Sequence, residues 1–192
     1  MVYLTLRFYL RNKERKIFIV DSFPVKAYEN HKRFRARIFS GKEFHGYTAT
    51  RKQYFFGLKV HMVVDTDGVP IEFAFTPAST ADVKALQNFT LDLPEEAVLM
   101  GDKAYTSYDL EDFLLETQKI KLLPKRRTNL KRQNTQEENF SLSIHRNRVE
   151  TVFSAITSRL PRYIKVRTEK GFALKLLFSI IGYMVHLYCP SV

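Results

Sequence analysis

Ala97-Val98-Leu99-Met100-Gly101-Asp102-Lys103-Ala104-Tyr105 is the stretch from which the fold prediction starts. A short apolar run ends in a glycine, which is followed by an acid and then by basic and aromatic side chains. This pattern indicates a buried strand whose carboxyl end presents one carboxylate. Open α/β sheets bind ligands at such strand ends, so Asp102 is the first candidate functional residue.

A second acid follows a similar run upstream. The β-branched segment Ile17-Phe18-Ile19-Val20 leads directly into Asp21, and Pro24 is expected to limit further strand pairing. We expect this strand to lie beside the strand that ends at Asp102. Taken alone, Asp21 is more simply explained as an ordinary turn aspartate.

A third acid lies on a predicted helix from Ile144 to Leu160. Its apolar residues recur at helical spacing, so the helix is expected to pack across the sheet. Arg146 and Glu150 are four residues apart and share a neighbouring face. An exposed pair at this spacing contributes only about 0.3–0.5 kcal/mol, and most such pairs are simply surface ion pairs.

The remaining chain alternates between strand and helix patterns. Asp65-Thr66-Asp67-Gly68 predicts a hairpin between Tyr54–Val64 and Val69–Thr76. Ser79 and Asp82 have the spacing of a capping box, which favours Asp82 as a cap rather than a catalytic acid. The predicted fold class is α/β, with a mixed five-stranded sheet and helices on both faces. The other expected elements are helices from Asp82 to about Phe89, Thr106 to Gln118 and Gly171 to Tyr188, and a strand from Ile120 to Leu123, with Gln133–Phe140 irregular.

The composition restricts the class of protein. The chain has 192 residues, a net charge of +11 and a single cysteine, Cys189, so it forms no internal disulfide. No signal peptide is evident, and the apolar run Leu176–Tyr188 is expected to be too short to span a bilayer. A globular chain with this much positive charge usually meets a polyanion, and nucleic acid is the first candidate. A solvated basic surface is the alternative, and net charge alone does not decide between them.

Positive charge is concentrated in two segments. In the insert at about 26–53, basic and aromatic residues alternate, which suits either a nucleic-acid surface or a core of aromatic rings with a charged rim. The basic loop at about 119–133 contains no acid as far as Arg132 and is expected to be mobile until a polyanion neutralises it. Its cations are Lys119, Lys121, Lys125, Arg126, Arg127, Lys131 and Arg132.

Three carboxylates would repel one another unless cations relieved the repulsion. Mg²⁺ prefers hard oxygen ligands and leaves room for phosphate oxygens. Two such ions, roughly 3.5–4 Å apart, can hold the attacking and leaving oxygens of a phosphoryl transfer. Acids at the centre and positive charge around them therefore predict metal-dependent chemistry on nucleic acid.

Five segments in order resemble the catalytic domain of bacterial insertion-sequence transposases of the DDE type, in the IS4-like branch. They are Val20–Pro24, Tyr54–His61, Thr76–Leu86, Gly101–Tyr105 and Arg146–Thr151. The resemblance implies an RNase H-like fold and a metal-binding triad of Asp21, Asp102 and Glu150. Arg146 matches the arginine that precedes the family's glutamate by four residues.

The chain also departs from that family. The fuller signature has a tyrosine and a lysine where this sequence has Ser143 and Thr157. We divide the chain into residues 1–16, a short remnant or edge element, and residues 17–188, the catalytic domain. Because residues 1–16 are too few for a helix-turn-helix domain, we expect the chain to be N-terminally truncated.

The functional prediction is a DNA transposase domain that cuts phosphodiester bonds at element ends and joins the 3′-hydroxyl to target DNA. Asp21, Asp102 and Glu150 would bind Mg²⁺ or Mn²⁺, and Lys103, Arg146, Lys125, Arg126, Arg127, Lys131 and Arg132 would contact DNA. Two alternatives stay open: a nuclease without strand transfer, and an inactive DNA-binding remnant. We expect double-stranded DNA as partner, a possible homodimer on DNA, no membrane association and a cytoplasmic, nucleoid-associated location. His61 is a weaker candidate and fits a core histidine better.

Overall fold

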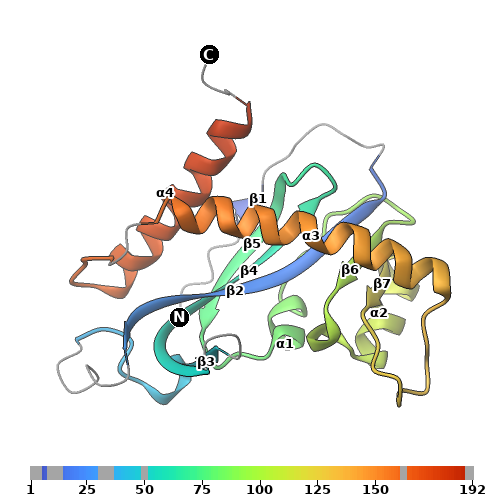
Figure 1. Cartoon of the computed structure of the whole chain (residues 1–192), viewed down its shortest axis with the longest axis horizontal. Helices are drawn as coiled ribbons and strands as arrows, with labels where there is room; N and C mark the ends of the chain where they lie inside the picture. Colours follow the sequence, from blue (N-terminus) through green and yellow to red (C-terminus); the bar gives the residue numbers. More distant parts are fainter. Residues whose placement is uncertain (1–5, 8–14, 30–36, 49–51, 161–163, 189–192) are drawn as a thin grey trace.

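A mixed seven-stranded sheet forms the centre of the molecule in the computed structural model (Figure 1). The structure describes residues 6–7, 15–29, 37–48, 52–160 and 164–188. Six strands follow the order β1-β5-β4-β2-β6-β7, and β3 pairs with β4 beside them. The strands are β1 Leu6–Arg7, β2 Ile17–Glu29, β3 His45–Thr48, β4 Gln53–Asp65, β5 Pro70–Pro77, β6 Val98–Gly101 and β7 Lys121–Pro124.

Helices cover both faces of this sheet, as expected for an RNase H-like fold. On one face, α3 and α4 pack over β2, β4 and β5 around residues such as Phe153 and Phe172. On the other face, α1, α2 and the short helix η3 enclose a second core around Val63, Leu99 and Leu110. The helices are η2 Lys42–Phe44, α1 Asp82–Leu86, η3 Lys103–Tyr105, α2 Tyr108–Gln118, α3 Gln136–Ser158 and α4 Glu169–Tyr188.

The predicted hairpin is confirmed, with its turn at Asp65-Thr66-Asp67-Gly68 between β4 and β5. The Asp65 carboxylate accepts hydrogen bonds from the backbone N–H groups of Asp67 and Val69, each at 2.9 Å. Gly68 has φ of +84°, and a Cβ there would lie 2.9 Å from a methyl group of Val152. Both the backbone conformation and the packing of α3 against the turn therefore require glycine.

The central pairing is the one the sequence predicted, because β2 runs parallel to β6 with Val20 opposite Gly101. Two strand predictions were wrong. The sheet has seven strands rather than five, since β1 pairs with β5 and β3 pairs with β4. The first strand also continues past Asp21 and Pro24 to Glu29 along β4. Beyond Val20 it has no parallel neighbour among the described strands, and proline is tolerated at such an edge.

The caps or ends of three helices differ from the predictions. Thr135 and Glu138 form a capping box, so α3 begins at Gln136 within the segment expected to be irregular. The cap of α2 is the Ser107 side chain rather than Thr106. The N-cap of α1 is Ala81, and α1 ends at Leu86, before Phe89. Asp82 is therefore the first helical residue and not a cap.

The last helix, α4, is longer than the apolar run suggested. By length and composition alone, Glu169–Leu187 could cross a membrane, which corrects the expectation that it is too short. In this structure α4 instead buries Phe172, Leu176 and Ile180 against the sheet. Core helices of this kind satisfy the same length and composition test, so the feature is weak support for a membrane span.

Candidate active site

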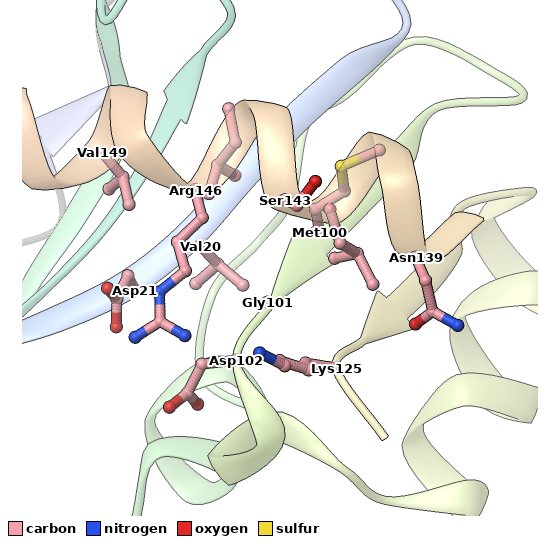
Figure 2. Close-up of a pocket in the computed structure, with 12 residues that line it drawn as sticks. Val20, Asp21, Met100, Gly101, Asp102, Lys125, Asn139, Ser143, Arg146 and Val149 are labelled. Atoms are coloured by element: carbon pink, nitrogen blue, oxygen red, sulfur yellow. The ribbon is translucent and has the colours of Figure 1, made fainter. Parts of the chain in front are cut away.

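A pocket of about 320 Å³ opens where β2, β6 and α3 meet (Figure 2). The parallel pairing of β2 with β6 ends at Val20 and Gly101, so Asp21 and Asp102 follow the last paired residues at one edge, and α3 crosses above them. The lining residues are Ile19, Val20, Asp21, Met100, Gly101, Asp102, Lys125, Asn139, Leu142, Ser143, Arg146 and Val149. The pocket thus combines two acids and two cations with an apolar floor.

Both predicted strand-end acids line this pocket. The Asp21 carboxylate accepts a hydrogen bond of 2.7 Å from the N–H of Ser22. Asp102 caps η3, and its Oδ1 accepts a hydrogen bond of 2.6 Å from the N–H of Ala104. The structure therefore brings Asp21 and Asp102 to the same site, since Val20 and Gly101 are paired immediately before them.

Burial raises the pKa of Asp21 from its ordinary 3.8 to about 7. The Ser22 N–H and the Arg146 charge oppose this rise, whereas the negative charges of Asp102 and Asp82 add to it. The carboxylates are thus close enough to repel one another. A bound cation would relieve this repulsion and favour ionised Asp21.

Arg146 reaches into the pocket from α3, as Figure 2 shows, and points toward Asp21 and Asp102. Its Nε–H also donates a hydrogen bond of 3.2 Å to Glu150 Oε1. Glu150 itself does not line the pocket, and its side chain is 59% exposed. The structure therefore connects Glu150 to the site through Arg146 and does not bring it together with the two aspartates.

The donor chemistry of the pocket suits a divalent cation, because Asp21 and Asp102 supply hard carboxylate oxygens. Within the described ranges, however, no three acidic, histidine or cysteine side chains are grouped so that they could hold one metal ion. Asp21 and Asp102 therefore lie together in the pocket, and Glu150 lies outside it.

The basic loop forms ion pairs with α2, so two of its cations are neutralised within the protein rather than by a polyanion. Arg126 forms two hydrogen bonds to Glu111, at 2.9 and 2.5 Å, and both side chains are only 8% exposed. Arg132 makes a similar pair of bonds to Asp112 at 2.6 and 2.8 Å. The loop contains no acid of its own, and the acids that pair with it, Glu111 and Asp112, lie on α2. Arg126 thus has a buried internal partner, which makes it a poor candidate for phosphate contacts, whereas the side chains of the Arg132–Asp112 pair are 47% and 48% exposed.

Other predicted cations remain on the surface. Lys103, Lys125, Arg127 and Lys131 are exposed and form no ion pair with any residue that the structure describes. Lys125 is the one of these that lines the pocket.

The insert at 26–53 is divided between core and surface. Phe39 is buried, and Tyr28 and Phe44 pack against the same core, which fits the aromatic-core alternative. Tyr47 is 53% exposed, which leaves it accessible to a partner. Phe34 and the cations at 32, 33, 35 and 51 lie outside the described residues.

Sequence reasoning missed several residues of the site. Asn139 and Ser143 line the pocket because α3 starts earlier than predicted, and the Thr135–Glu138 capping box was the available signal. Asp82 contacts Ser22 and Lys59 beside Asp21, although its sequence pattern suggested a cap. His61 is 1% exposed and outside the pocket lining, as expected for a core histidine.

Comparison with known proteins identifies the family of the chain. The family model described as "Transposase DDE domain" matches residues 12–187, which include every acid and cation discussed above. No curated protein matches the chain. Families of this type act on DNA in transposition and generally use divalent metal ions. Since the match covers nearly the whole sequence, the chain belongs to the transposase DDE domain family.

Proposed function

We propose that this protein is the catalytic domain of a DNA transposase that cuts DNA at element ends and joins the freed 3′-hydroxyl to target DNA. The observation that supports this most directly is the pocket in which Asp21 and Asp102 lie beside Arg146 and Lys125. Paired acids suit a cation, and the neighbouring cationic side chains suit a phosphodiester backbone.

Asp21 and Asp102 would hold Mg²⁺ or Mn²⁺. When bound, the cation stabilises negative charge on the attacking and leaving oxygens. We assign Glu150 as the third carboxylate. Its present ion pair with Arg146 is exposed, so exchanging that partner would cost only about 0.3–0.5 kcal/mol.

The two reactions are balanced displacements at phosphorus. In the first, one water is consumed, the P–O3′ bond breaks, and the products are a 3′-hydroxyl and a 5′-phosphate. In the second, the 3′-hydroxyl loses its proton and bonds to a target phosphorus, and the adjacent target 3′-oxygen leaves and takes up a proton. Both reactions need the scissile phosphate to be held in line, which is the role we assign to Arg146 and Lys125.

The remaining exposed cations would bind flanking duplex. Lys103, Arg127 and Lys131 lie on the segments that follow β6 and β7, close in sequence to the pocket residues Asp102 and Lys125. Double-stranded DNA is the proposed partner, bound by a homodimer that pairs two ends, in the cytoplasm with the nucleoid. Phosphate contacts of this kind make affinity fall steeply with salt.

The test is Mn²⁺-dependent cleavage of a duplex made from the DNA that flanks the coding sequence. We expect Asp21→Asn and Asp102→Asn to lower the cleavage rate by about 100-fold or more, because charge stabilisation of several kcal/mol is lost. Glu150→Gln should do the same, whereas Glu137→Gln, an exposed acid in the first turn of the same helix, should not.

Each outcome separates the alternatives. Cleavage without joined products favours a nuclease without strand transfer. Salt-sensitive DNA binding without any Mn²⁺-dependent cleavage favours an inactive remnant and overturns the proposal. Full activity in Glu150→Gln would show that the two aspartates act without Glu150.

A further inference from the structure

Next to Ser22, which follows the pocket residue Asp21, one carboxylate joins three elements of the fold. Asp82 Oδ1 accepts a hydrogen bond of 2.9 Å from Ser22 Oγ on β2 and one of 3.1 Å from Lys59 Nζ on β4. Lys59 Nζ also donates to the carbonyl of Thr80 at 2.9 Å. Although Asp82 starts α1, no side-chain hydrogen bond caps that helix, and the carboxylate bonds to the sheet instead.

The Ser22–Asp82 hydrogen bond lies where, within the described part of the chain, β2 is paired on one side only. Parallel pairing to β6 ends at Val20, so Asp21 and Ser22 are held by β4 alone among the described strands. Ser22 is also the residue whose N–H donates to the Asp21 carboxylate at 2.7 Å. Asp82 therefore contacts Asp21 indirectly, through a single residue that bonds to both.

The surroundings of Asp82 keep its carboxylate in one place. Its side chain is 17% exposed and that of Lys59 is 20% exposed, so solvent competes little for the pair. His61 Nδ1 lies 3.5 Å from the same oxygen, and His61 Nε2 is 2.9 Å from Thr76 Oγ1. Burial lowers the pKa of His61 to about 4, so the ring is neutral near pH 7 and leaves Lys59 as the countercharge.

We infer that Asp82 is a positioning residue for the proposed DNA-cleaving site. Through its hydrogen bond to Ser22, Asp82 holds β2 in place just beyond its last pairing with β6, and so orients Asp21 toward Asp102. It acts through hydrogen bonds to Ser22 and Lys59 and touches neither the metal nor the DNA. This inference rests on the proposed function, because it assigns a role within the same site.

The prediction concerns Mn²⁺ affinity, measured by calorimetry on the DNA-free protein, together with the cleavage rate. Removing a residue that orients a metal ligand typically costs about 10–100-fold in affinity or activity, and we expect that loss for Asp82→Ala and Ser22→Ala. Ser22→Thr keeps the hydroxyl and should remain close to wild type. Asp109→Ala removes an exposed acid from the first turn of α2 and should change neither quantity.

The variants also separate positioning from folding. If Asp82→Ala melts at a lower temperature, its loss of Mn²⁺ affinity could come from lower stability. Ser22→Ala then separates the two causes, since it removes the hydrogen bond to Asp82 and leaves the Lys59–Asp82 pair intact. Wild-type Mn²⁺ affinity and cleavage in Ser22→Ala would overturn the inference and leave the proposed function standing. Absence of Mn²⁺ binding by the wild-type protein would overturn both.

Discussion

Asp21→Asn is expected to stabilise the metal-free protein while abolishing its activity. The pKa of Asp21 is raised from 3.8 to about 7, chiefly by burial. At about 1.4 kcal/mol per pKa unit, that rise of roughly three units corresponds to a ceiling of about 4 kcal/mol in folding free energy. We expect about 1–3 kcal/mol, because the open pocket lets water screen part of the cost.

The sign follows from proton binding. A carboxyl group whose folded pKa lies above its unfolded pKa binds more protons in the folded state between those two values. The wild-type protein therefore loses stability relative to the asparagine variant as the pH rises from about 4 to about 7, and the difference is constant above that. Asparagine keeps an oxygen to accept the Ser22 N–H, so the hydrogen bond of 2.7 Å is not the quantity being tested.

Urea unfolding in EDTA at several pH values measures this difference. The free energies of the two proteins should coincide near pH 4 and diverge toward pH 8, with the variant more stable. Asp109→Asn, an exposed acid on α2, should show no such divergence. Saturating Mn²⁺ should reverse the order, because only the wild-type pocket gains binding energy. A pH-independent difference, or a less stable variant at pH 8, would refute the reasoning.

Two further predictions concern the scaffold. Arg126→Met should destabilise the fold by about 3 kcal/mol in urea unfolding, since the buried Glu111 loses both of its hydrogen bonds to Arg126 and keeps only Arg132 Nη1 at 3.9 Å. The double variant Arg126→Met with Glu111→Met should recover much of the loss. Lys125→Met, at an exposed neighbour, is the control, and an Arg126→Met variant as stable as Lys125→Met would contradict this account. Gly57→Ala should destabilise by more than about 4 kcal/mol, because its Cβ would lie 2.2 Å from the Val25 carbonyl oxygen. Gly182→Ala in α4 is the control: its Cβ would meet nothing within 4 Å, and it should gain about 0.5–1 kcal/mol. A soluble Gly57→Ala variant with wild-type stability would show that β2 can move at its register shift against β4, between Lys26 and Tyr28.

Local patterns were enough to predict the centre of the molecule. The apolar runs before Asp21 and Asp102 specify strands through side-chain preference, and their parallel pairing brings the two following acids to one edge. The hairpin turn was also predictable, because Asp65 and Gly68 satisfy its backbone locally. The central strands and the hairpin turn depend on residues that are close in sequence, and so they can be predicted from the sequence alone.

Other features depend on partners that are distant along the chain. Arg126 looked like a free cation because Glu111 lies on a different element, and Asp82 looked like a helix cap because Ser22 and Lys59 come from two strands. Glu150 shares a helix with Arg146, yet its spacing could not show that its side chain remains outside the pocket. The sequence alone therefore determined the two central parallel strands, the family and the two aspartates that meet. Only the tertiary structure decided which charges neutralise one another, because charge pairing depends on distances in space that residue spacing does not encode.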